Sequence, residues 1–126
     1  MKDLGRLITA MVTPFKNNGE VDFERAKDFA KALVNTGSDG LLIGGTTGES
    51  PSMNEDEKLK LFKSVKDAVG TTASVIAGTT DNNTIASIDL SKKAEKLGVD
   101  AILLTVPAYN KPTQEGLFQH FKKISE

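Results

Sequence analysis

The sequence predicts an α/β fold made of four consecutive β–α units. Four short apolar runs recur along the 126-residue chain, and each is followed by a polar loop and then by a stretch with helical periodicity. The runs span residues 7–12, 41–43, 73–77 and 101–106. They are nearly all apolar instead of alternating, which is typical of parallel strands covered on both faces.

Each helical stretch has its own start signal. Asp22 is a candidate cap for the first helix, and Asn54 with Glu57 resembles a capping box for the second. The third helix is predicted over 84–97, and Thr113 starts the fourth. The predicted inward-facing apolar residues are Phe23, Ala26, Ala30, Leu33 and Val34, then Leu61, Val65, Ala68 and Val69, then Ile85, Ile88 and Ala94, and finally Leu117, Phe121 and Ile124.

Two architectures fit this order of elements. Parallel strands joined by right-handed crossovers form either an open, doubly wound sheet or part of a (β/α)₈ barrel. A whole barrel takes about 250 residues, so four units would make half of one. No linker or low-complexity tract divides the chain, and residues 1–126 are therefore expected to form a single domain.

Composition excludes several functional classes. Sixteen basic and seventeen acidic residues give a net charge of −1, so bulk charge recruits neither nucleic acid nor an anionic membrane. The absence of cysteine removes disulfides, thiolate metal sites and thiol catalysis. No apolar run approaches the length of a membrane span and the start is polar, so we expect a cytoplasmic protein without signal peptide. No motif implies a metal or a cofactor.

The candidate site lies in the loops that follow the strands, because both architectures bind ligands there. The loop with the most distinctive sequence is Gly44-Gly45-Thr46-Thr47-Gly48-Glu49-Ser50. Its glycines let the backbone approach a ligand closely, and its two hydroxyls can hold a carboxylate or pass on a proton. The alternative is a glycine-rich turn whose threonines bond to local backbone.

Tyrosine and histidine each occur once in the chain. Tyr109, the one tyrosine, lies in a proline-rich loop on the same rim, where a phenol can relay protons or stack on a substrate. The alternative is an aromatic anchor that packs its ring against the loop. His120, the one histidine, is expected to be a surface residue or a residue with its hydrogen bonds satisfied.

Taken together, the rim loops resemble the dihydrodipicolinate synthase branch of the pyruvate-dependent class I aldolase family. The resemblance covers essentially all of the chain, and the run from Tyr109 to Leu117 favours this branch over the sialic-acid lyases. The runs that carry it are Thr13-Pro14-Phe15, Gly45-Thr46-Thr47-Gly48-Glu49-Ser50, Val75-Ile76-Ala77-Gly78-Thr79 and Tyr109-Asn110-Lys111-Pro112-Thr113-Gln114-Glu115-Gly116-Leu117.

The resemblance implies half of a TIM barrel and a reaction. In the family, pyruvate forms a Schiff base with a lysine, and its enamine attacks aspartate semialdehyde in lysine biosynthesis. The resemblance assigns Thr46 to a proton relay and Thr47 to the pyruvate carboxylate. Gly45 and Gly48 frame this substrate-binding loop. Tyr109 would join the relay from across a subunit interface.

The chain also departs from the family pattern. The family carries its Schiff-base lysine on the sixth strand, beyond the four units present here, so residues 1–126 are expected to be inactive alone. Lys111 lies in a loop that offers neither burial nor a cationic neighbour, and it is not expected to replace that lysine. Ala108 stands where relatives often have an aromatic. Glu55, Lys58 and Ala86 stand near the family's lysine-feedback positions, so no lysine regulation is predicted.

A second hypothesis is a structural unit that associates with itself and has no catalytic role. Half of a barrel leaves its first and fourth strands with free edges, and such edges favour pairing. Two copies joined edge to edge would close an eight-stranded barrel. Alternatively, the four units could relax into an open flavodoxin-like sheet. The sequence therefore predicts a homo-oligomer that binds a pyruvate-like keto acid weakly at best.

Overall fold

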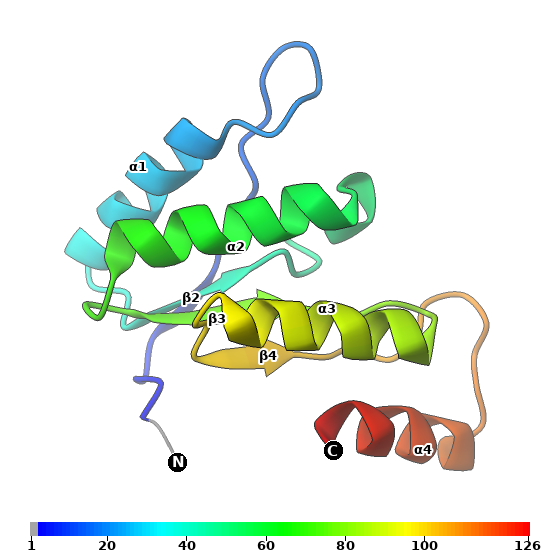
Figure 1. Ribbon diagram of the computed structural model, residues 1–126. Helices are drawn as coiled ribbons and strands as arrows, with labels where there is room; N and C mark the ends of the chain where they lie inside the picture. Colours follow the sequence, from blue (N-terminus) through cyan, green and yellow to red (C-terminus); the bar gives the residue numbers. More distant parts are fainter. Residues whose placement is uncertain (1–2) are drawn as a thin grey trace.

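The computed structural model describes residues 3–126, which form one parallel sheet covered by helices (Figure 1). The strands are β1 (Ile8–Ala10), β2 (Gly40–Ile43), β3 (Ser74–Gly78) and β4 (Ala101–Leu103). The helices are α1 (Phe23–Asn35), α2 (Glu55–Val69), α3 (Thr84–Lys96) and α4 (Gln114–Ser125), with a 3₁₀ turn at Ser50–Ser52. The four predicted β–α units are confirmed.

The order of the strands decides between the two architectures. The sheet runs β1-β2-β3-β4, and every neighbouring pair is parallel. A doubly wound sheet reverses direction at a switch point, whereas a barrel adds each strand on the same side of the last. Buried side chains of α1, α2 and α3 enter one core with the same face of β2 and β3. The fold is therefore half of a (β/α)₈ barrel.

The predicted capping residues start the helices. The Asp22 side chain accepts a hydrogen bond from the backbone N–H of Arg25 at 3.0 Å. Asn54 and Glu57 form a complete capping box, with both hydrogen bonds at 2.9 Å. Thr113 accepts from the N–H of Gly116 at 3.1 Å. These bonds satisfy donors that the first helical turn leaves unpaired.

The core lies between the sheet and its helices. Leu41 and Val75 project into it from the strands, and Phe62 and Val65 meet them from α2, all fully buried. Phe62 was not among the predicted inward-facing residues. The prediction for Ile85 is wrong, because its side chain is 69% exposed. α3 instead turns Ser87, Leu90, Ser91 and Ala94 inward.

The opposite face and the two sheet edges are less covered. Alternation along the strands places Ile8 and Leu42 on the face away from the helices, and Ile8 is 40% exposed. Among the described residues, β1 and β4 each pair on one side only. The expectation of strands covered on both faces therefore holds for β3, whose five residues are all buried, and not for β1.

β4 is shorter than the predicted 101–106. The ladder ends at Leu103, whose carbonyl accepts from the N–H of Thr79 at 3.3 Å. Beyond it, the N–H of Thr105 donates to the Thr80 hydroxyl instead of to a strand. None of the helices described between residues 3 and 126 is long and apolar enough to cross a membrane.

The prediction for His120 holds only in part. Its side chain is buried between α4 and α3, and its Nδ1 lies 2.9 Å from the Thr84 hydroxyl. Its Nε2 has no hydrogen-bond partner in the described part of the chain. The reason is the rotation of α4, which buries His120 and Ile124 and leaves Leu117 and Phe121 only partly covered.

Candidate functional site

A pocket of about 420 Å³ opens at the carboxyl ends of the strands, between the loops that follow β2, β3 and β4. Two of the predicted site residues, Gly45 and Thr46, line it. Its full lining is Gly44, Gly45, Thr46, Ser50, Pro51, Lys58, Gly78, Thr80, Asp81, Asn82, Leu103, Thr105, Val106 and Ala108. The pocket thus lies where sequence reasoning placed the site.

Glycines bring the β2 and β3 loops into contact. A β-carbon on Gly78 would overlap the carbonyl oxygen of Gly44 and lie 2.9 Å from the backbone nitrogen of Gly45. Gly44 has a φ of +64°, and a β-carbon there would lie 3.0 Å from the Phe62 ring. Gly78 has no room for a β-carbon, and Gly44 combines a positive φ with a close neighbour. Only glycine fits at each position without strain, so the two glycines fix the path of the backbone that leads to Thr46.

Gly48 closes the other end of the loop. The buried Thr13 hydroxyl, just after β1, donates a 2.6 Å hydrogen bond to the Gly48 carbonyl oxygen. A β-carbon on Gly48 would lie 3.1 Å from the Met11 carbonyl oxygen. Gly48 is buried and outside the pocket lining, so its contribution in this structure is to seat the loop on β1.

The two threonines present free hydroxyl groups. Both are exposed, and neither hydroxyl hydrogen-bonds to any residue within 3–126. The turn is held by backbone bonds instead, with the N–H of Glu49 donating to the Thr46 carbonyl at 3.1 Å. Glu49 itself is left-handed, with φ 54°. The alternative in which the threonines bond to local backbone is therefore wrong, and Thr47 lies beside the pocket without lining it.

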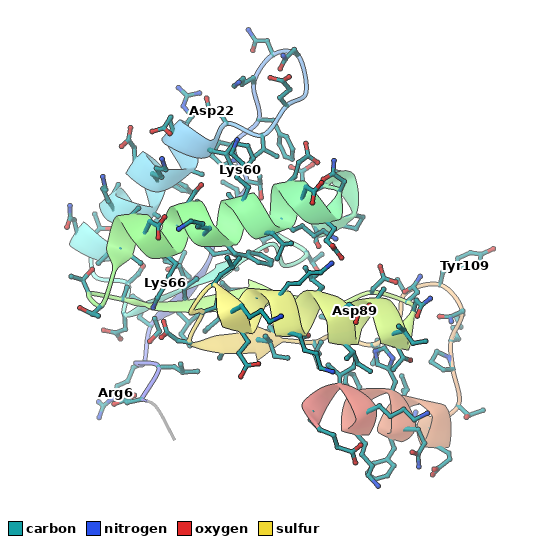
Figure 2. All side chains as sticks on the ribbon, viewed as in Figure 1. Arg6, Asp22, Lys60, Lys66, Asp89 and Tyr109 are labelled. Carbon is teal, nitrogen blue, oxygen red and sulfur yellow. The ribbon has the colours of Figure 1, made fainter. Side chains whose placement is uncertain are left out.

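Tyr109 projects away from the molecule (Figure 2). Its side chain is 99% exposed, and its backbone is left-handed with φ 72°. It does not line the pocket, although its neighbour Ala108 does. The alternative in which the ring packs against its own loop is therefore wrong. Within one copy of the chain, Thr46 and Tyr109 are not brought together.

Sequence reasoning did not single out the residues that connect the rim loops. Thr80 Oγ1 accepts from the Thr105 N–H at 2.7 Å, and Asn82 Oδ1 accepts from the Ala108 N–H at 2.8 Å. Lys58 of α2, half-buried, adds a positive charge to the lining. The available signal was position alone, since Thr80 and Asn82 follow directly after β3.

The shifted pKa values belong to groups outside the pocket. Backbone hydrogen bonds from Leu7 and Arg6 lower the pKa of Asp39, at the amino-terminal side of the sheet. A hydrogen bond to Glu55 raises the pKa of Lys93 and joins α3 to α2. In the described residues, no group of three or more histidine, cysteine, aspartate or glutamate side chains is placed to hold a metal.

Comparison with known proteins identifies the family. The sequence pattern of the dihydrodipicolinate synthetase family matches residues 3–126. The chain belongs to this family. Over all 126 residues it is 59% identical to a 4-hydroxy-tetrahydrodipicolinate synthase of Dehalococcoides mccartyi, and it spans 42% of the length of that relative.

Solved structures of dihydrodipicolinate synthases share the fold. One from Bacillus anthracis superposes with a TM-score of 0.95 at 50% identity, covering 99% of this chain and 43% of that one. A chloride-inhibited synthase of Acinetobacter baumannii, complexed with pyruvate, gives 0.94 at 37% identity, covering 98% and 42%. The expected half-barrel and the expected family are both confirmed, and the chain spans well under half the length of these relatives.

Proposed function

We propose that this chain forms the N-terminal part of the active site of a 4-hydroxy-tetrahydrodipicolinate synthase, which condenses pyruvate with aspartate semialdehyde for lysine biosynthesis. The observation that carries the proposal is the pair of free hydroxyls on Thr46 and Thr47, in a loop whose backbone is fixed at both ends. The pyruvate bound in the Acinetobacter baumannii relative supports a keto acid as the ligand.

Each residue has a distinct role in the proposal. Thr47 donates its hydroxyl hydrogen to the pyruvate carboxylate, and the Gly45 and Gly48 backbone frames that contact. A lysine amine condenses with the keto carbon and releases water, after which loss of a methyl proton gives the enamine that attacks the aldehyde carbon. Thr46 moves protons between these intermediates and Tyr109.

The exposure of Tyr109 supports a relay between two copies. Its side chain is 99% exposed and does not line the pocket of its own chain. We therefore assign the tyrosine beside Thr46 to a neighbouring subunit.

The Schiff-base amine is proposed to come from outside residues 1–126. The Lys66 side chain is only 17% exposed, and it forms an ion pair with Asp100 at 2.7 Å. Figure 2 shows Lys66 near the amino-terminal end of the sheet, away from Tyr109. Lys58 lines the pocket but is only half-buried. On this proposal, residues 1–126 alone do not catalyse the condensation.

Completion of the barrel tests the proposed roles. We would fuse residues 1–126 to the remaining C-terminal portion of the Dehalococcoides mccartyi synthase and measure the condensation. The fusion is expected to be active. Thr46→Val should lower kcat by about 10²–10⁴, the usual contribution of a proton-transfer group. Thr47→Val should act mainly on the KM for pyruvate.

A matched control uses Thr36, an exposed threonine whose hydroxyl bonds to the Ala32 carbonyl at the end of α1. Thr36→Val should leave both kinetic constants unchanged. A folded fusion without activity, or full activity in Thr46→Val, would overturn the proposal.

A second candidate function is self-association, favoured by the open strand edges. Exposed apolar side chains gather at β1, where Leu7 is 56%, Ile8 40% and Val12 48% exposed. Beside β4, a hollow of about 580 Å³ is lined in part by Ile102 and Ile124. Two copies could pair β1 of one with β4 of the other and cover both surfaces.

Sedimentation tests this second candidate. The 126-residue chain is expected to sediment as a dimer at micromolar concentration, and Ile8→Lys should convert it to a monomer. The control is Ile85→Lys, because Ile85 is also exposed but lies outside the lining of the hollow beside β4. A monomeric unmodified chain would contradict self-association.

A further inference from the structure

We propose that Asn82 is a positioning residue for Tyr109: its side-chain oxygen holds the Ala108 backbone N–H and thereby fixes the direction in which the tyrosine projects. The bond is 2.8 Å long and joins the loop after β3 to the loop after β4. Its effect on catalysis rests on the proposed function, whereas its effect on the loop does not.

The loop that carries Tyr109 has few other attachments. Between residues 104 and 112, the hydrogen bonds to another element come from Thr105 and Ala108, and they end on Thr80 and Asn82. The remaining bond of this stretch is internal, from the Asn110 N–H to the Ala108 carbonyl at 2.9 Å. Pro107, just before Ala108, has no N–H to donate. The bond to Asn82 is therefore the tether closest to Tyr109.

The loop that holds Asn82 is itself firmly braced. The Asp81 N–H donates to the hydroxyl of Ser87 at 2.8 Å, and that hydroxyl donates back to the Asp81 carbonyl at 3.2 Å. Ser87 is completely buried. The Asn83 N–H donates to the Asp81 carboxylate at 2.7 Å. A short polar side chain on this braced loop can hold a partner in one place.

The backbone of Tyr109 explains why a tether is needed. Its φ of 72° lies in the left-handed region, which is unfavourable for a non-glycine residue because the β-carbon crowds the following carbonyl oxygen. Lys111, two residues on, is also left-handed, with φ 41°. Such conformations persist when the surroundings impose them. With the ring fully in solvent, the constraint has to come through the backbone, and Asn82 supplies it beside the strained residue.

The chain offers a direct reporter for this inference. It contains one tyrosine and no tryptophan, so intrinsic fluorescence comes from Tyr109 alone. In the unmodified 126-residue chain, the anisotropy of this emission should show a fast component from rotation of the exposed ring and a slow component from tumbling of the whole molecule. In Asn82→Leu, a nanosecond local component should replace much of that slow decay, because free loops move on this timescale.

Two further variants separate positioning from a general loss of structure. Asn82→Asp keeps an oxygen that accepts the Ala108 N–H, and it should restore the slow decay. Asn18→Leu is the matched control: Asn18 Oδ1 accepts the Glu20 N–H at 3.1 Å in a different exposed loop. It should leave the Tyr109 decay unchanged. If Asn82→Leu loses helical circular dichroism, Asn82→Ala takes its place.

The fused enzyme gives a second, separate readout. Asn82→Leu should lower kcat while leaving the KM for pyruvate unchanged, and Asn82→Asp should restore kcat. An inactive fusion together with the expected anisotropy change would reject the proposed function and keep the positioning role. An unchanged anisotropy decay in both Asn82→Leu and Asn82→Ala would overturn the inference.

Discussion

The hydroxyl of Thr13 donates to the carbonyl oxygen of Gly48 across 2.6 Å, and this bond ties the end of β1 to the loop that carries Thr46 and Thr47. Thr13 and Gly48 are both buried. A bond in this environment both stabilises the half-barrel and sets the position of the candidate site. The same contact thus links the stability of the fold to the position of the candidate site.

Removal of the Thr13 hydroxyl should destabilise the protein. Thr13→Val keeps the shape of the side chain but leaves the buried Gly48 carbonyl without its donor, which costs about 1–3 kcal/mol. Urea denaturation followed by circular dichroism measures the loss. Thr36→Val removes an exposed hydroxyl and should cost less. Equal losses of stability in the two variants would show that the buried Thr13 hydrogen bond stabilises the fold no more than an exposed one does.

Gly78→Ala should be among the more damaging single changes at the rim. Its β-carbon would overlap the Gly44 carbonyl oxygen, and backbone has to move to make room. Overpacking of this kind costs about 1–3 kcal/mol or more. For comparison, Gly70→Ala meets nothing within 4 Å and is strained only by its φ of +57°.

The two glycine variants separate steric overlap from backbone strain. We expect Gly78→Ala to lower the midpoint of urea denaturation and to weaken the binding of pyruvate at the loop that carries Thr46 and Thr47. Gly70→Ala should affect stability alone, because Gly70 ends α2 at the opposite side of the sheet. A Gly78→Ala protein with unchanged stability would contradict the close approach of the two loops.

Asp39 should make the fold sensitive to acid. The pKa of its carboxyl lies below the usual value because it accepts the backbone N–H groups of Leu7 and Arg6. The stability that this carboxylate adds to the folded state is therefore fully present above the unfolded-state pKa of 3.8. It is lost as pH falls through the lowered folded-state pKa. Asn in its place does not titrate, so Asp39→Asn should flatten the fall in stability between neutral pH and about pH 3.

Urea denaturation across this pH range measures the effect. Asp28, on the exposed face of α1, serves as the control position. Asp28→Asn should keep the pH dependence of the unmodified chain. An Asp39→Asn protein with the same acid sensitivity as the unmodified chain would show that these backbone bonds do not contribute to it.

The sequence was most informative where local chemistry decides the structure. Asp22, Asn54 and Thr113 start their helices as expected, because each supplies an acceptor that the first turn needs. The order of strands and helices followed from periodicity, and the position of the pocket followed from the general rule that ligands bind at the carboxyl ends of parallel strands.

The errors arose where tertiary packing decides. Ile85 was expected inside from its spacing, but the contact face of α3 is set by how the helix rotates against the sheet. His120 lies on the packed side of α4 for the same reason. For Asn82 and Thr80 the sequence indicates only their position after β3, because the contacts that make them important are to backbone donors 26 and 25 residues away.

Trapping with borohydride tests the central claim most directly. The claim is that residues 1–126 carry the hydroxyl groups of the site, while the amine that captures pyruvate comes from elsewhere in the barrel. The chain and the fused enzyme are each incubated with pyruvate and borohydride and analysed by peptide mass spectrometry. The expected result is one reduced adduct, on a lysine of the added portion, and no adduct on the 126-residue chain. A stable adduct on Lys58, or on any other lysine of this chain, would contradict the account.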